Sequence, residues 1–106
     1  MSRAFVTRAM MARLPATPKL VLIVLADCST EDGKSCASIA RITGLVGCAE
    51  YELSAVLRQF KVIGLLHGER EADPSLPSRF IIDVDMLDRL AIPDMWRRLV
   101  DDRGAA

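Results

Sequence analysis

The chain has 106 residues, 51% hydrophobic and 26% charged, so it is long enough for one compact domain and too apolar to be disordered. Fourteen lysines and arginines balance fourteen acids, which excludes a strongly basic protein that coats nucleic acid through bulk charge. The three cysteines and single histidine lack the paired spacing of a zinc site, so we expect neither a metal nor another cofactor. No segment approaches the ~18–20 apolar residues of a transmembrane helix. We therefore expect a cytoplasmic protein with no membrane partner.

Two helices are predicted in the first half of the chain. The first begins at Thr17–Pro18, where threonine suits the N-cap and proline the first turn, and continues through the apolar segment 19–27. Ser35 or Ser38 can cap the second helix. The segment 44–47 contains two glycines and is expected to break that helix.

A third helix is predicted from about residue 49 to residue 63, with Gly64 as its C-terminal glycine. Its apolar residues recur at i, i+3, i+4 and i+7, which indicates one buried stripe. The stripe consists of Leu53, Val56, Leu57 and Phe60. We expect Leu53, Leu57 and Phe60, together with Leu22 of the first helix, to be almost fully buried.

A β-hairpin and further helical segments are predicted after the third helix. The strands are expected at 65–67 and 79–82, with a long polar loop between them. Asp83 or Asp85 can cap the next helix, and Pro93 opens a last helical segment. The order helix, helix, turn, helix, β-hairpin, helix predicts an α+β, mainly α fold: a winged helix-turn-helix with a three-helix core and a β-hairpin wing over residues 1–83. A C-terminal helical extension is expected over residues 84–106.

Parts of the sequence resemble the winged helix-turn-helix family of phage replication proteins and small phage and plasmid DNA-binding regulators. The resemblance covers about residues 5–83, and Phe5–Val6 is similar to a short strand in the family's lead-in. It implies DNA binding, with the third helix in the major groove and the wing along the phosphate backbone. The segments that carry the resemblance are 5–14, 17–22, 31–36, 38–45 and 62–66.

The candidate DNA-binding residues lie on the outward face of the third helix and at basic positions around it. Arginine, lysine and tyrosine side chains can donate to phosphates, and arginine or glutamine can read base edges. The first hypothesis is a regulator of transcription or replication that binds double-stranded DNA. Its candidate contacts are Lys34, Arg41, Tyr51, Arg58, Gln59, Arg70 and Arg79.

The start of the third helix supports an alternative from another class. It carries Glu50 and Glu52 and no base, and its outward face includes Cys48, Tyr51 and Ala55. Aromatic residues are enriched in protein interfaces, so the alternative is a winged-helix interaction module that binds a protein partner through this helix and has lost sequence-specific DNA binding. No nucleophile–base grouping or phosphate loop is present, so we do not expect an enzyme.

The C-terminal segment carries one more apolar stripe with helical spacing. An exposed stripe bearing tryptophan would be a liability, and two-fold symmetry would double the phosphate contacts of a regulator. We therefore expect a homodimer whose interface lies within residues 84–102. The stripe consists of Ile92, Met95, Trp96 and Leu99.

Overall fold

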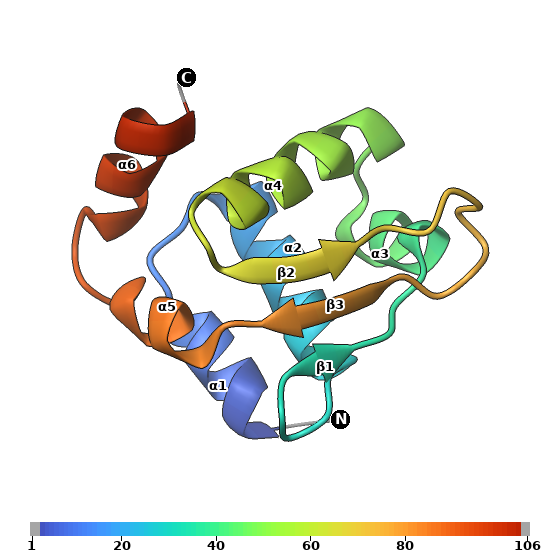
Figure 1. Ribbon diagram of the computed structural model, residues 1–106, viewed down its shortest axis with the longest axis horizontal. Coiled ribbons are helices and arrows are strands. Elements are labelled where there is room, and N and C mark those ends of the chain that lie inside the picture. Colours follow the sequence, from blue (N-terminus) through green and yellow to red (C-terminus); the bar gives the residue numbers. More distant parts are fainter. Residues whose placement is uncertain (1–2, 105–106) are drawn as a thin grey trace.

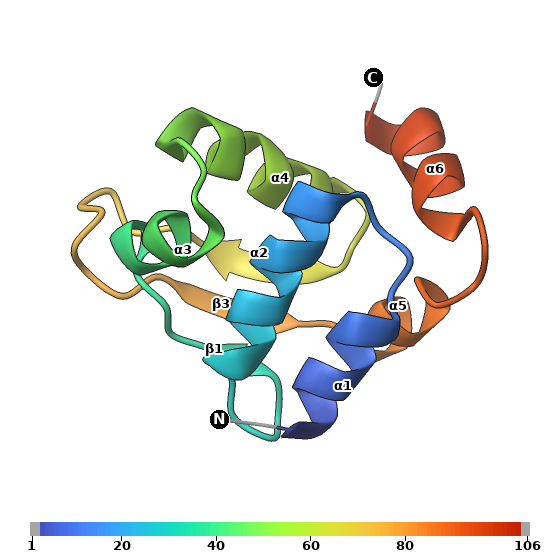
Figure 2. The same cartoon turned by 180° about the vertical axis from the view of Figure 1, so that it is seen from behind.

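The computed structural model describes residues 3–104, which form an α+β, mainly helical domain with a three-stranded antiparallel sheet. Figure 1 shows the strands in front of α2, and Figure 2 shows α2 in front of the strands with α1 and α3 on either side. In chain order the elements are α1 (Arg3–Met11), α2 (Ala16–Asp27), β1 (Lys34–Ser35), α3 (Ile39–Val46), α4 (Glu50–Val62), β2 (Leu66–Glu69), β3 (Arg79–Ile82), α5 (Val84–Arg89), α6 (Met95–Leu99) and a π-helical turn (Val100–Gly104).

The sheet has the order β1-β3-β2, so the last strand in the chain lies in the middle. Lys34 of β1 and His67 of β2 both pair with Ile81 of β3. Phe80 and Ile82 are buried, whereas Arg79 and Ile81 are exposed, because successive side chains of a strand point to opposite faces. One face of the sheet therefore covers the helices and the other faces solvent.

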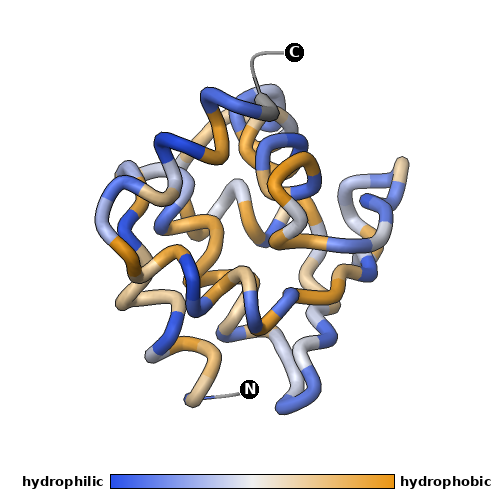
Figure 3. Tube along the Cα trace, turned by 60° about the vertical axis from the view of Figure 1, so that its left-hand side comes forward, coloured by the Kyte–Doolittle hydropathy of each residue, from blue (hydrophilic) through white to orange (hydrophobic). Residues whose placement is uncertain are grey.

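One hydrophobic core joins α1 to α6. Leu22, Leu53, Leu57 and Phe60 are buried, which confirms their predicted burial and the inward stripe of α4. In Figure 3 hydrophobic residues run through the middle of the molecule, and the loop between β2 and β3 is mainly hydrophilic.

Several predicted helix ends are confirmed. The Ser38 side chain accepts a hydrogen bond from the Arg41 backbone N–H (3.1 Å), so it caps α3. The Asp83 carboxylate accepts one from the Met86 N–H (2.9 Å) and caps α5 in the same way. Gly47 ends α3 with a left-handed φ of 79°, a conformation that glycine adopts without steric cost.

Three local predictions are wrong. Phe5–Val6 is not a strand, because the whole segment Arg3–Met11 is helical and buries Phe5 and Ala9. Helix α2 begins at Ala16, one residue before the expected cap Thr17, with Pro15 at its N-cap. Helix α3 does not stop at Gly44 but continues to Val46, and packing of its buried residues offsets the low helix propensity of glycine.

The C-terminal segment folds back onto the core. Met86, Leu87, Leu90 and Leu99 are buried, and the Trp96 ring meets the ring of Phe60 edge-on, with centroids 5.8 Å apart at 81°. Of the four residues expected to form a homodimer interface, Leu99 is buried, two are half-buried against the core, and only Ile92 is exposed. A homodimer through this segment stays a prediction, but most of its expected surface is already covered.

Candidate nucleic-acid interface

Helix α4 presents a mixed polar and apolar face to solvent. Because the apolar stripe of α4 is buried, Tyr51, Ala55 and Arg58 on the other side of the helix are exposed. Gln59 is half-buried beside them. Tyr51 in the first turn is 77% exposed. Three candidate contacts predicted from the sequence, Tyr51, Arg58 and Gln59, therefore belong to one accessible side of one helix.

A cleft of about 360 Å³ lies between α4 and the hairpin. Arg58 and Lys61 line it from α4, one helical turn apart, and Arg70 lines it from the end of β2. Glu69 contributes the only acidic group of the lining, so the cleft has an excess of positive charge. The Ser54 hydroxyl and the side chains of Leu57 and Phe80 complete its lining.

Two ion pairs hold the end of β2 against α4. Arg70 Nη2 lies 2.6 Å from Glu50 Oε1, and Arg70 Nη1 donates to the Ser54 hydroxyl. Lys61 Nζ lies 3.0 Å from Glu69 Oε2. Arg70 is thus positioned by α4, and part of its charge is already neutralised within the chain.

The two acids at the start of α4 both have structural contacts. Glu50 pairs with Arg70, and the Glu52 carboxylate accepts a hydrogen bond from the Ala49 backbone N–H (3.1 Å). Negative charge in the first turn is also favourable to the helix dipole. These acids therefore stabilise α4 and its contact with the hairpin, which sequence reasoning did not foresee because Glu50 and Arg70 are 20 residues apart.

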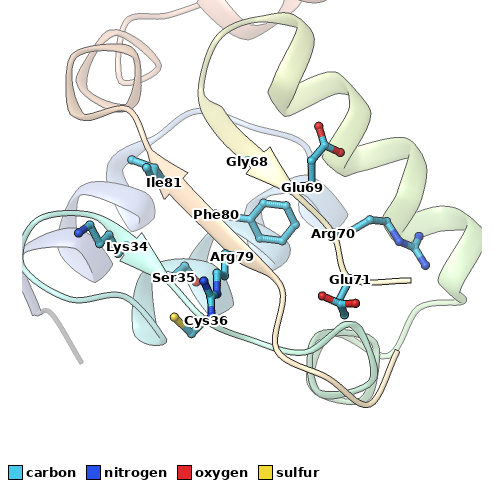
Figure 4. A pocket seen from close by; sticks show the side chains of 10 residues that line it. All are labelled: Lys34, Ser35, Cys36, Gly68, Glu69, Arg70, Glu71, Arg79, Phe80 and Ile81. Atoms are coloured by element: carbon cyan, nitrogen blue, oxygen red, sulfur yellow. The ribbon is translucent and has the colours of Figure 1, made fainter. Parts of the chain in front are cut away.

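A second hollow of about 590 Å³ lies over the solvent face of the sheet, and Arg70 lines it as well. Lys34 and Arg79 contribute its other cations, and Glu69 and Glu71 its acids. Figure 4 shows Lys34 and Arg79 beside the sheet and Arg70 extended toward α4. Lys34 Nζ lies 3.7 Å from the carboxylate of Asp32, so this cation is also partly neutralised.

The structure brings some of the predicted basic contacts together, but not all of them. Arg58 and Arg70 share the cleft, and Arg70 shares the sheet hollow with Lys34 and Arg79, whereas Arg41 lies exposed on α3 and lines neither. Within residues 3–104, Arg41, Arg58 and Arg79 form no ion pair. Their charges remain available to an anionic ligand.

The loop between β2 and β3 is attached to α3. The Ala40 backbone N–H donates to the Pro74 carbonyl (2.9 Å), and the Ser78 N–H donates to the Ala37 carbonyl (3.1 Å). The Glu71 N–H donates to the buried Ser78 hydroxyl (2.8 Å). The hairpin is thus fixed relative to both α3 and α4, and so are the cations it carries.

Ser54 was not among the predicted contacts, although it lines the cleft. Lys61, a basic residue that also suits a phosphate contact, follows Arg58 by three residues and lines the cleft with it. Nothing in the sequence shows that the side of α4 bearing Ser54 faces the hairpin.

Cys36 and Cys48 lie near this region, and both are free thiols. Burial raises the pKa of the Cys48 thiol before α4, and the nearby charge of Glu52 adds to the effect. Cys36 after β1 is exposed. Within the described part of the chain, no group of three or more histidine, cysteine or acidic side chains is placed to hold a metal ion. In the same residues, no helix is both long enough and apolar enough to cross a membrane.

Comparison with protein-family models, curated proteins and solved structures finds no match to this chain.

Proposed function

We propose that the chain is a small winged-helix protein that binds double-stranded DNA as a regulator of transcription or replication. In this proposal α2, α3 and α4 are the three core helices, α4 is the recognition helix, and β2 with β3 is the wing. The order α2-β1-α3-α4-β2-β3 and the sheet order β1-β3-β2 support it.

The observation that carries the proposal is the excess of positive charge between α4 and the hairpin. Arg58, Lys61 and Arg70 converge on one cleft. Glu69 and Glu50 offset the charges of Lys61 and Arg70, which leaves Arg58 as the cation of the cleft with no ion pair among residues 3–104, and Arg79 adds another over the sheet. Phosphate contacts made by such side chains supply most non-specific DNA affinity. The exposed α4 face beside the cleft carries Arg58, and guanidinium groups can also read guanine edges.

A salt titration tests the proposal. Binding of the protein to a short fluorescent duplex of random sequence is followed by anisotropy from low to physiological salt. Log affinity should fall linearly with log salt, and Arg58→Ala or Arg79→Ala should reduce the slope by about 0.9 for each phosphate that the variant no longer neutralises. If Arg58 reads a base, its removal should also cost about 1–3 kcal/mol on a preferred sequence.

Arg97→Ala is the matched control, because Arg97 is exposed on α6 and has no ion pair among residues 3–104. It should leave the salt slope unchanged. Absence of binding at low salt, or an equal decrease in all three variants, contradicts a DNA interface between α4 and the hairpin.

A protein partner is the second candidate function, favoured by exposed apolar residues on both sides of the α3–α4 turn. Leu45 of α3 is 60% exposed, and Tyr51 of α4 is 77% exposed. In this case α4 would be covered by a protein and not by DNA. The intact chain would then show no binding to the duplex in the salt titration. Tyr51→Ala would abolish partner binding without changing the unfolding temperature.

A further inference from the structure

The side of the molecule away from the sheet has an apolar surface that the proposed function does not use. Figure 2 shows α1 and α2 on this side. Met10 of α1 is 57% exposed and Leu20 of α2 is 47% exposed, while Val6 and Ile23 are half-buried. We call these four residues the α1–α2 face.

The arrangement of the two helices makes this face continuous. Arg3, Val6, Met10 and Asp27 line one shallow hollow, so the end of α2 lies beside the start of α1 and the helices run antiparallel. Met10 lines the same hollow as Asp27, so it lies beside the end of α2. Leu20 and Ile23 precede Asp27 by seven and four residues, which places all three on one side of α2.

Opposite charges lie at the two ends of α2 on this side. Lys19 is in the first turn and Asp27 is the last residue, and both are half-buried. Neither forms an ion pair within residues 3–104, although Arg3 lines the same hollow as Asp27. An antiparallel copy of the same helix would bring Asp27 to a lysine and to the positive end of a helix dipole.

We infer that the α1–α2 face binds a second copy of this chain. The two α2 helices cross antiparallel about a two-fold axis between Leu20 and Ile23, so Leu20 packs on the partner's Ile23. Asp27 then reaches the first turn of the partner's α2, where the partner's Lys19 lies. A two-fold axis makes every contact twice, and the zero net charge of the chain opposes association only weakly.

The charges that flank the α1–α2 face, Lys19 and Asp27, identify the occupant as a second copy. A partner of one charge sign would satisfy Lys19 or Asp27 and repel the other, whereas the antiparallel copy satisfies both ends. The surface is also distinct from the apolar stripe expected to form an interface within residues 84–102, of whose four residues only Ile92 is exposed. It faces away from the sheet, so a dimer would leave the sheet hollow open (Figures 1 and 2).

Sedimentation equilibrium of the intact chain over a wide concentration range tests the inference. The protein should show twice the mass of one chain at high concentration. Leu20→Asp should raise the dimer dissociation constant about tenfold or more, because it places a charge in the centre of an apolar interface. A monomer at every concentration overturns the proposal. Leu45→Asp and Ile92→Asp are controls at exposed apolar positions outside the face and should leave the dissociation constant unchanged.

A charge exchange gives a test that does not depend on apolar packing. Lys19→Asp and Asp27→Lys should each raise the dissociation constant by about fivefold or more, because each replaces two attractive charge pairs of the dimer with repulsive ones. The double variant should restore the dissociation constant. Circular dichroism checks that each variant is folded. If the double variant is folded but does not restore the dimer, the antiparallel pairing is wrong. If Ile92→Asp has the same effect as Leu20→Asp, the interface lies in the C-terminal segment instead.

Discussion

The loop before β3 and the segment after it are attached to the domain in opposite ways. The loop, residues 70–78, is held by backbone hydrogen bonds to Ala37 and Ala40 and by the Arg70–Glu50 ion pair. The segment after residue 83 is held by buried apolar side chains, with Trp96 packed against Phe60. Polar attachment fixes a geometry with little gain in stability, whereas apolar burial supplies stability.

This difference explains why the C-terminal segment is part of the core although it follows the hairpin. Half-burial of Trp96 and full burial of Leu99 remove apolar surface that would otherwise face water. The loop, in contrast, leaves most of its side chains exposed, and its one cation, Arg70, keeps access to solvent. The effects of substitutions in these two regions should therefore differ in magnitude and in the property that they change.

The largest effect on stability is expected from Phe60→Ala, which removes the ring on which the C-terminal segment packs. The ring is fully buried and packs against Trp96, so its removal should cost roughly 3–5 kcal/mol of unfolding free energy and leave the domain largely unfolded. A urea titration, monitored through the fluorescence of the single tryptophan, measures this loss of unfolding free energy. Phe60→Leu, which keeps much of the volume, should cost far less. A shift of only a few degrees for Phe60→Ala would place Phe60 outside the core.

An intermediate effect is expected in the hairpin, from Gly68→Ala. Gly68 has a φ of +105°, and a Cβ there would collide with the carbonyl oxygen of Arg79. Alanine should therefore destabilise the protein by about 1–3 kcal/mol. Gly44→Ala in α3 is the comparison, since no atom lies within 4 Å of its Cβ position, and it should stabilise by up to about 1 kcal/mol. Thermal unfolding of the two variants should show shifts of opposite sign.

The smallest effect on stability is expected from Glu50→Gln, which removes the charge partner of Arg70. Both side chains are partly exposed, so the decrease should not exceed about 1 kcal/mol. Because Arg70 then keeps its full charge, affinity for a random duplex at low salt should rise. Glu71→Gln removes a charge that forms no ion pair in the described residues and serves as control. An affinity gain no greater than that of Glu71→Gln would argue that Arg70 does not face DNA.

Local signals in the sequence predicted much of the secondary structure. The caps Ser38 and Asp83, the glycine after α3 and the strand Arg79–Ile82 are confirmed because each depends on neighbouring residues. The helical spacing of α4 likewise identified its buried stripe.

Two of the errors arose where distant residues decide the structure, and one where a resemblance was preferred to a local pattern. The stripe containing Trp96 showed that something must cover it, but not that Phe60 of the same chain does so. The acids of α4 suggested repulsion of DNA, because their contacts with Ala49 and Arg70 depend on the folded geometry. The strand expected at Phe5–Val6 followed the family resemblance, whereas the spacing of Phe5 and Ala9 suits the helix that forms.

The position of β1 also bears on how the chain folds during synthesis. Within the sheet this two-residue strand pairs with β3, and Lys34 meets Ile81, which is made 47 residues later. Helices α1 and α2 can associate as soon as they leave the ribosome, because their contacts are local. Residues 28–36 have no sheet to join until β3 has emerged, so we expect the nascent chain to keep this segment open to chaperones until translation is almost complete.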